Sequence, residues 1–165
     1  MRDYLWVFRK FNENEIKYIV VGGLAVNLHG IPRMTYDLDI LLDLDDDANV
    51  ERFLRLLKEW GFRPRVPVDI MDFADAEKRG SWIKDKNMKA FNLVNSEWAL
   101  SEIDIIIDTP VNYKEASTDI RHITLKDISV PLISIAGLIK MKEAANRRQD
   151  LADIRYLKRI DDEET

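Results

Sequence analysis

The sequence of 165 residues contains no cysteine and only two histidines. Without cysteine, the chain has no disulfide framework, no thiolate nucleophile and no cysteine-based zinc site. The two histidines, His29 and His122, lie far apart in the sequence and form no recognisable metal-ligand spacing. These absences exclude thiol chemistry and are compatible with a reducing compartment.

The chain also lacks long hydrophobic runs and an excess of positive charge. No apolar run approaches the roughly 20 residues that a membrane-spanning helix needs, and the N-terminal stretch MRDYLWVFRKFNENE is too charged for a signal peptide. We therefore expect a cytoplasmic protein with no membrane partner. The formal net charge of −5 argues against a broad nucleic-acid-binding surface, because phosphate neutralisation needs clustered Lys and Arg. A local basic cleft remains compatible with this charge.

Hydrophobic residues make up 46% of the chain and charged residues 33%, as in ordinary globular domains. We predict one domain over residues 1–165, with a sheet-containing core (1–130) followed by C-terminal helices (131–165). Strands and helices alternate early and helices follow, which predicts an α/β (α+β) fold with one mixed β-sheet flanked by helices. Helices are expected over 3–14, 24–29, 45–60 and from 132 onward with a break near 147–150, and strands over 18–21, 38–42, 62–66, 90–94, 102–107 and 120–125. Residues 69–87 show no clean period and are expected to form a helix plus a mobile loop.

The most informative stretch reads VVGGLAVNLHGIPRMTYDLDILLD. A hydrophobic strand runs into Gly22 and Gly23 and a short helix, and a second strand carries Asp37 and Asp39. Side chains two positions apart on a strand share a face, so both carboxylates should project together. A divalent cation usually relieves such repulsion, and a glycine turn that opens a helix offers backbone N–H groups to a phosphate. The pattern predicts a site for a metal-bound nucleoside triphosphate, with two ordinary surface aspartates as the structural alternative.

A two-metal centre needs a third carboxylate from a neighbouring strand. In the segment SEIDIIID, Glu102, Asp104 and Asp108 share one face by parity. Asp104 lies inside the apolar run, where an unpaired charge is costly, whereas Asp108 is explained as a turn residue before Thr109. We therefore predict Asp104 as the third ligand and as the general base for an attacking hydroxyl.

The stretch GGLAVNLHGIPRMTYDLDI, with the later strand that carries Asp104, resembles the signature of the DNA polymerase β-like nucleotidyltransferase superfamily. It is similar in particular to small prokaryotic members, the abortive-infection and type IV toxin-like nucleotidyltransferases. Many relatives have Gly-Ser at the turn where this chain has Gly-Gly, so backbone N–H groups would bear more of the phosphate binding here. The resemblance covers most of residues 18–107, and the matching positions are Gly22, Gly23, Asp37, Asp39 and Asp104.

A triphosphate needs cations beyond its metal ions. Arg33, just before the acidic strand, is a candidate phosphate or substrate ligand, with a solvated loop arginine as the alternative. Thr35 could add a hydroxyl or simply shape the turn. The resemblance implies that Lys140 contacts the triphosphate, slightly favoured over Arg147, and the alternative is the solvated face of an amphipathic helix. The acidic pair Asp150 and Asp153 is explained as the cap and first turn of the last helix.

The resemblance implies a nucleotidyltransferase that uses two Mg²⁺ or Mn²⁺ ions and an NTP, such as ATP, as substrate. The enzyme would transfer NMP to a hydroxyl or phosphate of a protein, a tRNA end or a small molecule, with release of pyrophosphate. The alternative is a catalytically inactive module of the same fold that binds a nucleotide or a partner, as half of a toxin–antitoxin pair or as a homodimer. A third interpretation is a purely structural domain in which the acidic strand is incidental.

Overall fold

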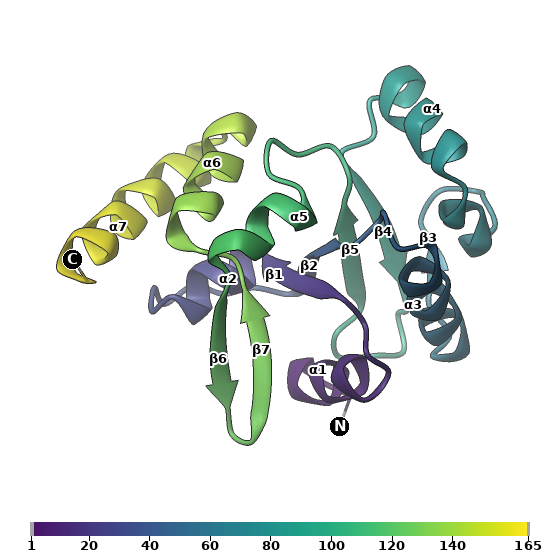
Figure 1. Ribbon diagram of the computed structural model, residues 1–165, viewed down its shortest axis with the longest axis horizontal. Coiled ribbons are helices and arrows are strands. Elements are labelled where there is room, and N and C mark those ends of the chain that lie inside the picture. Colours follow the sequence, from purple (N-terminus) through teal and green to yellow (C-terminus); the bar gives the residue numbers. More distant parts are fainter. Residues whose placement is uncertain (1, 165) are drawn as a thin grey trace.

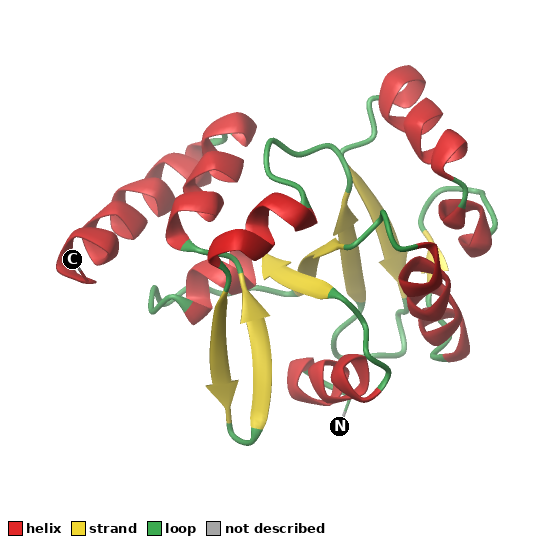
Figure 2. Cartoon of the chain, viewed as in Figure 1, coloured by secondary structure: helices red, strands yellow, loops and turns green. Residues whose placement is uncertain are grey.

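Seven strands form one mixed sheet in the computed structural model, which describes residues 2–164 (Figures 1 and 2). The order across the sheet is β3-β4-β5-β2-β1-β7-β6. Most neighbouring pairs are antiparallel, but β2 runs parallel to β5 and β1 parallel to β7. The strands are β1 (Tyr18–Val21), β2 (Asp37–Leu42), β3 (Arg63–Pro64), β4 (Ala90–Val94), β5 (Glu102–Ile106), β6 (Arg121–Leu125) and β7 (Ile128–Leu132).

Helices flank this sheet and occupy the C-terminus, so the predicted α/β class with a helical C-terminal segment is confirmed. Figure 1 shows α6 and α7 side by side at one end of the molecule, with α3, η1 and α4 at the other. Within residues 2–164, no helix combines the length and apolar character required to span a membrane. The helices are α1 (Tyr4–Glu13), α2 (Gly22–Leu28), α3 (Asp47–Glu59), η1 (Ile70–Ala74), α4 (Ala76–Lys86), α5 (Tyr113–Ala116), η2 (Ser117–Asp119), α6 (Ile135–Ala145) and α7 (Arg148–Glu164).

The acidic strand is held in place by a continuous hydrophobic core. In β2, Leu38 and Ile40 are fully buried, while Asp37 and Asp39 alternate with them on the other face. This alternation follows from the two-residue period of a strand and directs the carboxylates away from the core on the Leu38 side. The fully buried Asn49 at the start of α3 bonds the backbone of Lys17, which fixes the entry to β1 beside the exit of β2.

Several parts of the fold differ from the sequence-based expectation, including the unpredicted short helices α5 and η2. β7 was not predicted; it forms a hairpin with β6 and pairs with β1. The strand expected over 62–66 is reduced to Arg63–Pro64. Residues 69–87 contain two short helices, η1 and α4, whose first turns are capped by the side chains of Asp69 and Asp75.

Candidate active site

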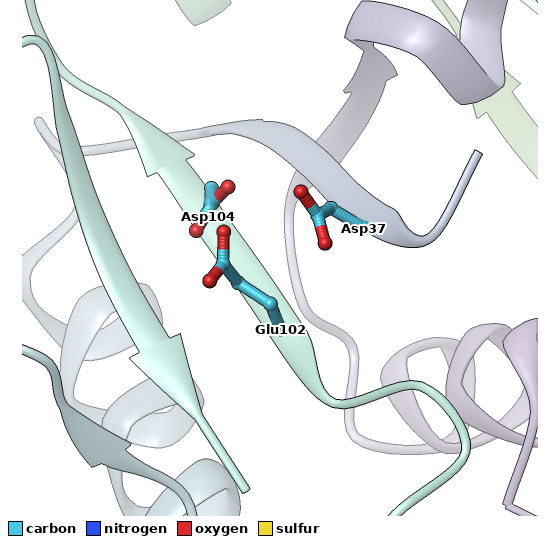
Figure 3. Close-up of side chains that lie close together, drawn as sticks. All are labelled: Asp37, Glu102 and Asp104. Atoms are coloured by element: carbon cyan, nitrogen blue, oxygen red, sulfur yellow. The ribbon is translucent and has the colours of Figure 1, made fainter. Parts of the chain in front are cut away.

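The sheet register brings the acidic side chains of β2 and β5 together. Asp37 lies beside Glu102, and Asp39 beside Asp104, in the parallel pairing of the two strands. Figure 3 shows the carboxylates of Asp37, Glu102 and Asp104 converging from the two strands. One oxygen from each of these three groups lies within 4.8 Å of the others. The predicted approach of Asp37 to Asp104 is present in the structure, and Glu102 joins it. Asp39, the remaining predicted ligand, lies outside this group of three oxygens and beside Asp104 in the sheet register.

Gly22 lies directly against the carboxylate of Asp39. Its φ angle of +68° belongs to the left-handed region, and a Cβ there would lie 2.8 Å from Cγ of Asp39 and overlap its Oδ2. Only glycine meets both conditions without strain. The antiparallel register of Val21 with Asp39 produces this close approach. The helix α2 then begins without a side-chain cap, so its first N–H groups have no side-chain acceptor.

Burial and mutual repulsion make the carboxylates hard to ionise together. Burial and the neighbouring Asp104 raise the pKa of Asp39 to about 7. Burial, followed by repulsion from Asp104, also raises the pKa of Asp37. Burial raises the pKa of Asp104 as well, although Nδ2 of Asn92 donates a hydrogen bond of 2.8 Å to its Oδ1. A cation among these oxygens would relieve the repulsion, and carboxylate oxygens are the ligands that Mg²⁺ and Mn²⁺ prefer.

We call Asp37, Asp39, Glu102 and Asp104 the acidic group. Its three aspartates line a cavity of about 640 Å³ between the sheet and the C-terminal helices. Positive charge lines the same space, because Lys142 of α6, Arg147 and Lys89 border it. The cavity therefore combines carboxylates suited to cations with ammonium and guanidinium groups suited to phosphates. On the sheet side its lining includes Gly22, Asp37, Asp39 and Asp104.

Lys142, which sequence reasoning missed, is the buried lysine of α6. Its Nζ lies 3.3 Å from Oδ1 of Asp150 and 2.9 Å from Oδ2 of Asp153, and all three side chains are buried. In contrast, Lys140 is exposed and is absent from the cavity lining. The sequence signal for Lys142 is its helical spacing from Ile135, which places both residues on the buried face of α6. A charged residue on a buried face needs partners of opposite charge.

The other predicted phosphate ligands lie beside Gly23 but outside the cavity lining. The side chains of Arg33 and Thr35 approach Gly23, at 3.6 Å and 3.3 Å from the position of a Cβ there. Neither residue borders the cavity, and Arg33 is paired with the buried Asp153. Arg147 borders the cavity with its side chain 74% exposed, while its Nε donates to Oδ2 of Asp150 at 2.8 Å.

Asp150 lies in the first turn of α7 instead of at the predicted cap position, and Asp153 lies one turn further on. Oδ2 of Asp150 accepts a hydrogen bond of 3.0 Å from the backbone N–H of Arg147, at the start of α7. The same carboxylate pairs with Lys142 and with the Arg147 side chain, and these cations help to hold the pKa of Asp150 below its usual range. The acidic pair at the start of α7 therefore anchors the cations that border the cavity.

The family model of the nucleotidyl transferase AbiEii toxin, from type IV toxin–antitoxin systems, matches residues 7–165. The chain belongs to this family. Membership of the AbiEii family confirms the resemblance to small prokaryotic nucleotidyltransferases. Among curated proteins, none matches the sequence.

Solved structures share this fold at low sequence identity. The lincomycin-bound lincosamide antibiotic adenylyltransferase LnuA is 20% identical, with a TM-score of 0.63 over 94% of both chains. A proposed nucleotidyltransferase from Thermotoga maritima is 17% identical, with a TM-score of 0.52 over 97% of this chain and 93% of that chain. An antigenic nucleotidyltransferase-like protein from Paracoccidioides brasiliensis is 16% identical, with a TM-score of 0.53 over 94% of this chain and 72% of that one.

Proposed function

We propose that the protein is a metal-dependent nucleotidyltransferase that transfers NMP from an NTP to an acceptor oxygen and releases pyrophosphate. The observation that carries this proposal is the group of carboxylates from β2 and β5, which borders a cavity lined on its other side by cations. If the site held only structural ion pairs, its four carboxylates would be matched by a similar number of cations. Family membership supports the same reaction class.

Asp37, Asp39 and Asp104 are proposed to hold two Mg²⁺ or Mn²⁺ ions, and Glu102 offers a further carboxylate. The fit rests on the donor set, since all of these ligands are hard oxygens, and burial and the neighbouring Asp104 raise the pKa of Asp39, which a bound cation would counter. When bound, the ions would stabilise negative charge at the α-phosphorus and on the leaving group. Burial of Asp39 against Gly22 keeps its oxygens aimed at one position.

The triphosphate is proposed to lie in the cavity of about 640 Å³. The backbone N–H groups of Gly22 and Gly23 would face its oxygens at the uncapped start of α2. Arg147 and Lys142 border the same cavity and take the part that the family resemblance implied for Lys140. Arg33 is proposed to act indirectly, because it pairs with Asp153 and Asp153 in turn positions Lys142.

The acceptor oxygen would attack the α-phosphorus, and the bond from that phosphorus to the oxygen bridging to the β-phosphorus would break. Pyrophosphate leaves with the electron pair, and the proton of an acceptor hydroxyl passes to Asp104. Asp104 suits a base because burial raises its pKa and Asn92 donates a hydrogen bond that orients its carboxylate. The acceptor belongs to a protein, a tRNA end or a small molecule.

The test is transfer of radioactive label from each of four α-labelled NTPs, with Mg²⁺ or Mn²⁺ and a cell extract. We expect a labelled product whose identity gives both donor and acceptor, and loss of labelling in the Asp39→Asn variant. The matched control is Asp45→Asn, because Asp45 is an exposed aspartate outside the acidic group. Equal labelling by wild type and a folded Asp39→Asn variant would refute the site assignment.

Membership of a toxin–antitoxin family supports the further proposal that an antitoxin opposes this activity. Expression of the wild-type protein without that partner is then expected to slow growth, and expression of Asp39→Asn is not. Equal growth inhibition by both proteins would separate toxicity from nucleotide transfer and contradict this proposal.

A further inference from the structure

A second cavity of about 790 Å³ borders the acidic group. Three arginines line it, Arg2, Arg63 and Arg65, in a protein whose formal net charge is −5. Such a concentration of guanidinium groups contrasts with the acidic composition of the chain as a whole. Two glutamates, Glu97 and Glu102, also line the cavity, so the arginines outnumber the carboxylates.

The short edge strand β3 positions two of these arginines. Arg63 and Arg65 are two positions apart, and the backbone N–H of Arg65 donates to the carbonyl of Asn92 on the neighbouring strand β4. Alternate residues of an extended chain project to the same side, so both side chains reach the cavity. Arg65 pairs with Glu102, while Arg63 is exposed and forms no ion pair within residues 2–164. Arg2 lies over the ring of Trp98, with its Cζ 5.2 Å from the ring centre.

Glu102 connects this arginine-lined cavity with the acidic group. Its carboxylate lines the cavity, yet one of its oxygens lies within 4.8 Å of oxygens of Asp37 and Asp104. Asp37 and Asp104 in turn line the other cavity, which contains Gly22 and Arg147. The two cavities therefore meet different members of the acidic group, since Glu102 lines this one and Asp37, Asp39 and Asp104 line the other. Because Glu102 lies beside Asp37 and Asp104 (Figure 3), molecules in the two cavities would approach neighbouring carboxylates.

We infer that the arginine-lined cavity binds the acceptor, and that this acceptor carries a phosphate ester close to its reacting oxygen. The inference rests on the proposed function, which assigns the glycine turn and Arg147 to the triphosphate and leaves this second cavity for the other substrate. Guanidinium groups bind phosphate oxygens through paired N–H donors, and a neutral acceptor would gain nothing from them. Arg63 is the principal phosphate ligand, because Arg65 is already engaged by Glu102.

Calorimetric titration of the whole protein with inorganic phosphate, without NTP or metal, tests the binding site. Glucose 6-phosphate and a phosphodiester dinucleotide then distinguish a sugar phosphate from a nucleotide chain, with glucose and a nucleoside as uncharged controls. We expect the phosphate compounds to bind, and Arg63→Ala to weaken that binding about tenfold. The matched control Arg55→Ala removes an exposed arginine of α3 that is absent from the cavity lining, and it should bind like wild type. Unchanged phosphate binding by Arg63→Ala would overturn the inference.

Label transfer into a cell extract tests the acceptor role separately from the proposed function. The Arg63→Glu variant should lose most labelling while its thermal stabilisation by Mg·ATP equals that of wild type, because Arg63 is absent from the lining of the other cavity. Full labelling by Arg63→Glu would overturn the acceptor cavity and leave the nucleotidyltransferase proposal intact. Absence of labelling with the wild-type protein would instead count against the proposed function itself.

Discussion

Replacing Asp39 with asparagine is expected to stabilise the metal-free protein while removing its activity. Asparagine has nearly the same shape as aspartate and keeps a carbonyl oxygen and an amide for Asp104. It removes the charge that burial and Asp104 make costly, and with it a ligand for a cation. A residue that serves only folding would lose stability in such a change, so the opposite sign marks a functional carboxylate.

The pKa of Asp39 sets the size and the pH range of this effect. This pKa rises from the ordinary value of 3.8 to about 7 in the folded protein. The folded protein therefore binds more protons than the unfolded chain between these values, and this contribution to stability is lost as the pH rises through about 7. Each pKa unit corresponds to about 1.4 kcal/mol, which gives an upper bound of about 4 kcal/mol for the penalty at pH 8. Coupling to Asp104 distributes this penalty over both carboxylates, so the measurable gain lies below that bound.

Urea denaturation of both proteins in EDTA, at pH 5 and pH 8, measures the effect. We expect Asp39→Asn to be more stable than wild type at pH 8 and the difference to shrink at pH 5, where wild-type Asp39 is protonated. Mn²⁺ should stabilise wild type more than the variant, because the ion binds the folded state through the carboxylates. A variant less stable than wild type at pH 8, or equally stabilised by Mn²⁺, would refute the reasoning.

Three further results are expected. Gly22→Ala should lose transfer activity and about 1–3 kcal/mol of stability in urea denaturation, because a Cβ at a φ of +68° would overlap the carboxylate of Asp39; wild-type values would refute the close approach. Lys142→Met should lose about 3 kcal/mol, because it removes the buried cation that Asp150 and Asp153 share and leaves each carboxylate with a single arginine partner. Lys140→Met, at an exposed position, should match wild type in the same assay, and equal losses would contradict their assignments. Calorimetric Mn²⁺ affinity should rise from pH 5.5 to pH 8 as protons leave Asp39, and a flat profile would place the metal elsewhere.

The sequence predicted the parts of the site that depend on local periodicity. The alternation of Asp37 and Asp39 with buried leucine and isoleucine required a shared face, and the apolar run around Asp104 required a partner for its charge. Gly22 was predicted as a phosphate turn, but its contact with Asp39 depends on the β1–β2 register. That register cannot be read from either strand alone.

The parts that were missed depend on contacts between distant segments. Lys142 is buried because α7 returns to place Asp150 and Asp153 beside α6, whereas Lys140 was predicted only from the family resemblance. Glu102 joined the acidic group only because the parallel register sets it beside Asp37. Arg63 lies on a two-residue edge strand with no hydrophobic pattern of its own, so nothing local marked it as a cavity residue.

Asp37, Asp39 and Asp104 are proposed to form one metal-binding centre. The most direct measurement is anomalous diffraction from crystals of the protein grown with Mn²⁺ and a non-hydrolysable ATP analogue. We predict manganese peaks in direct contact with oxygens of these three aspartates, with the triphosphate beside Gly22. Manganese bound elsewhere, with the three carboxylates left without an ion, would contradict the account.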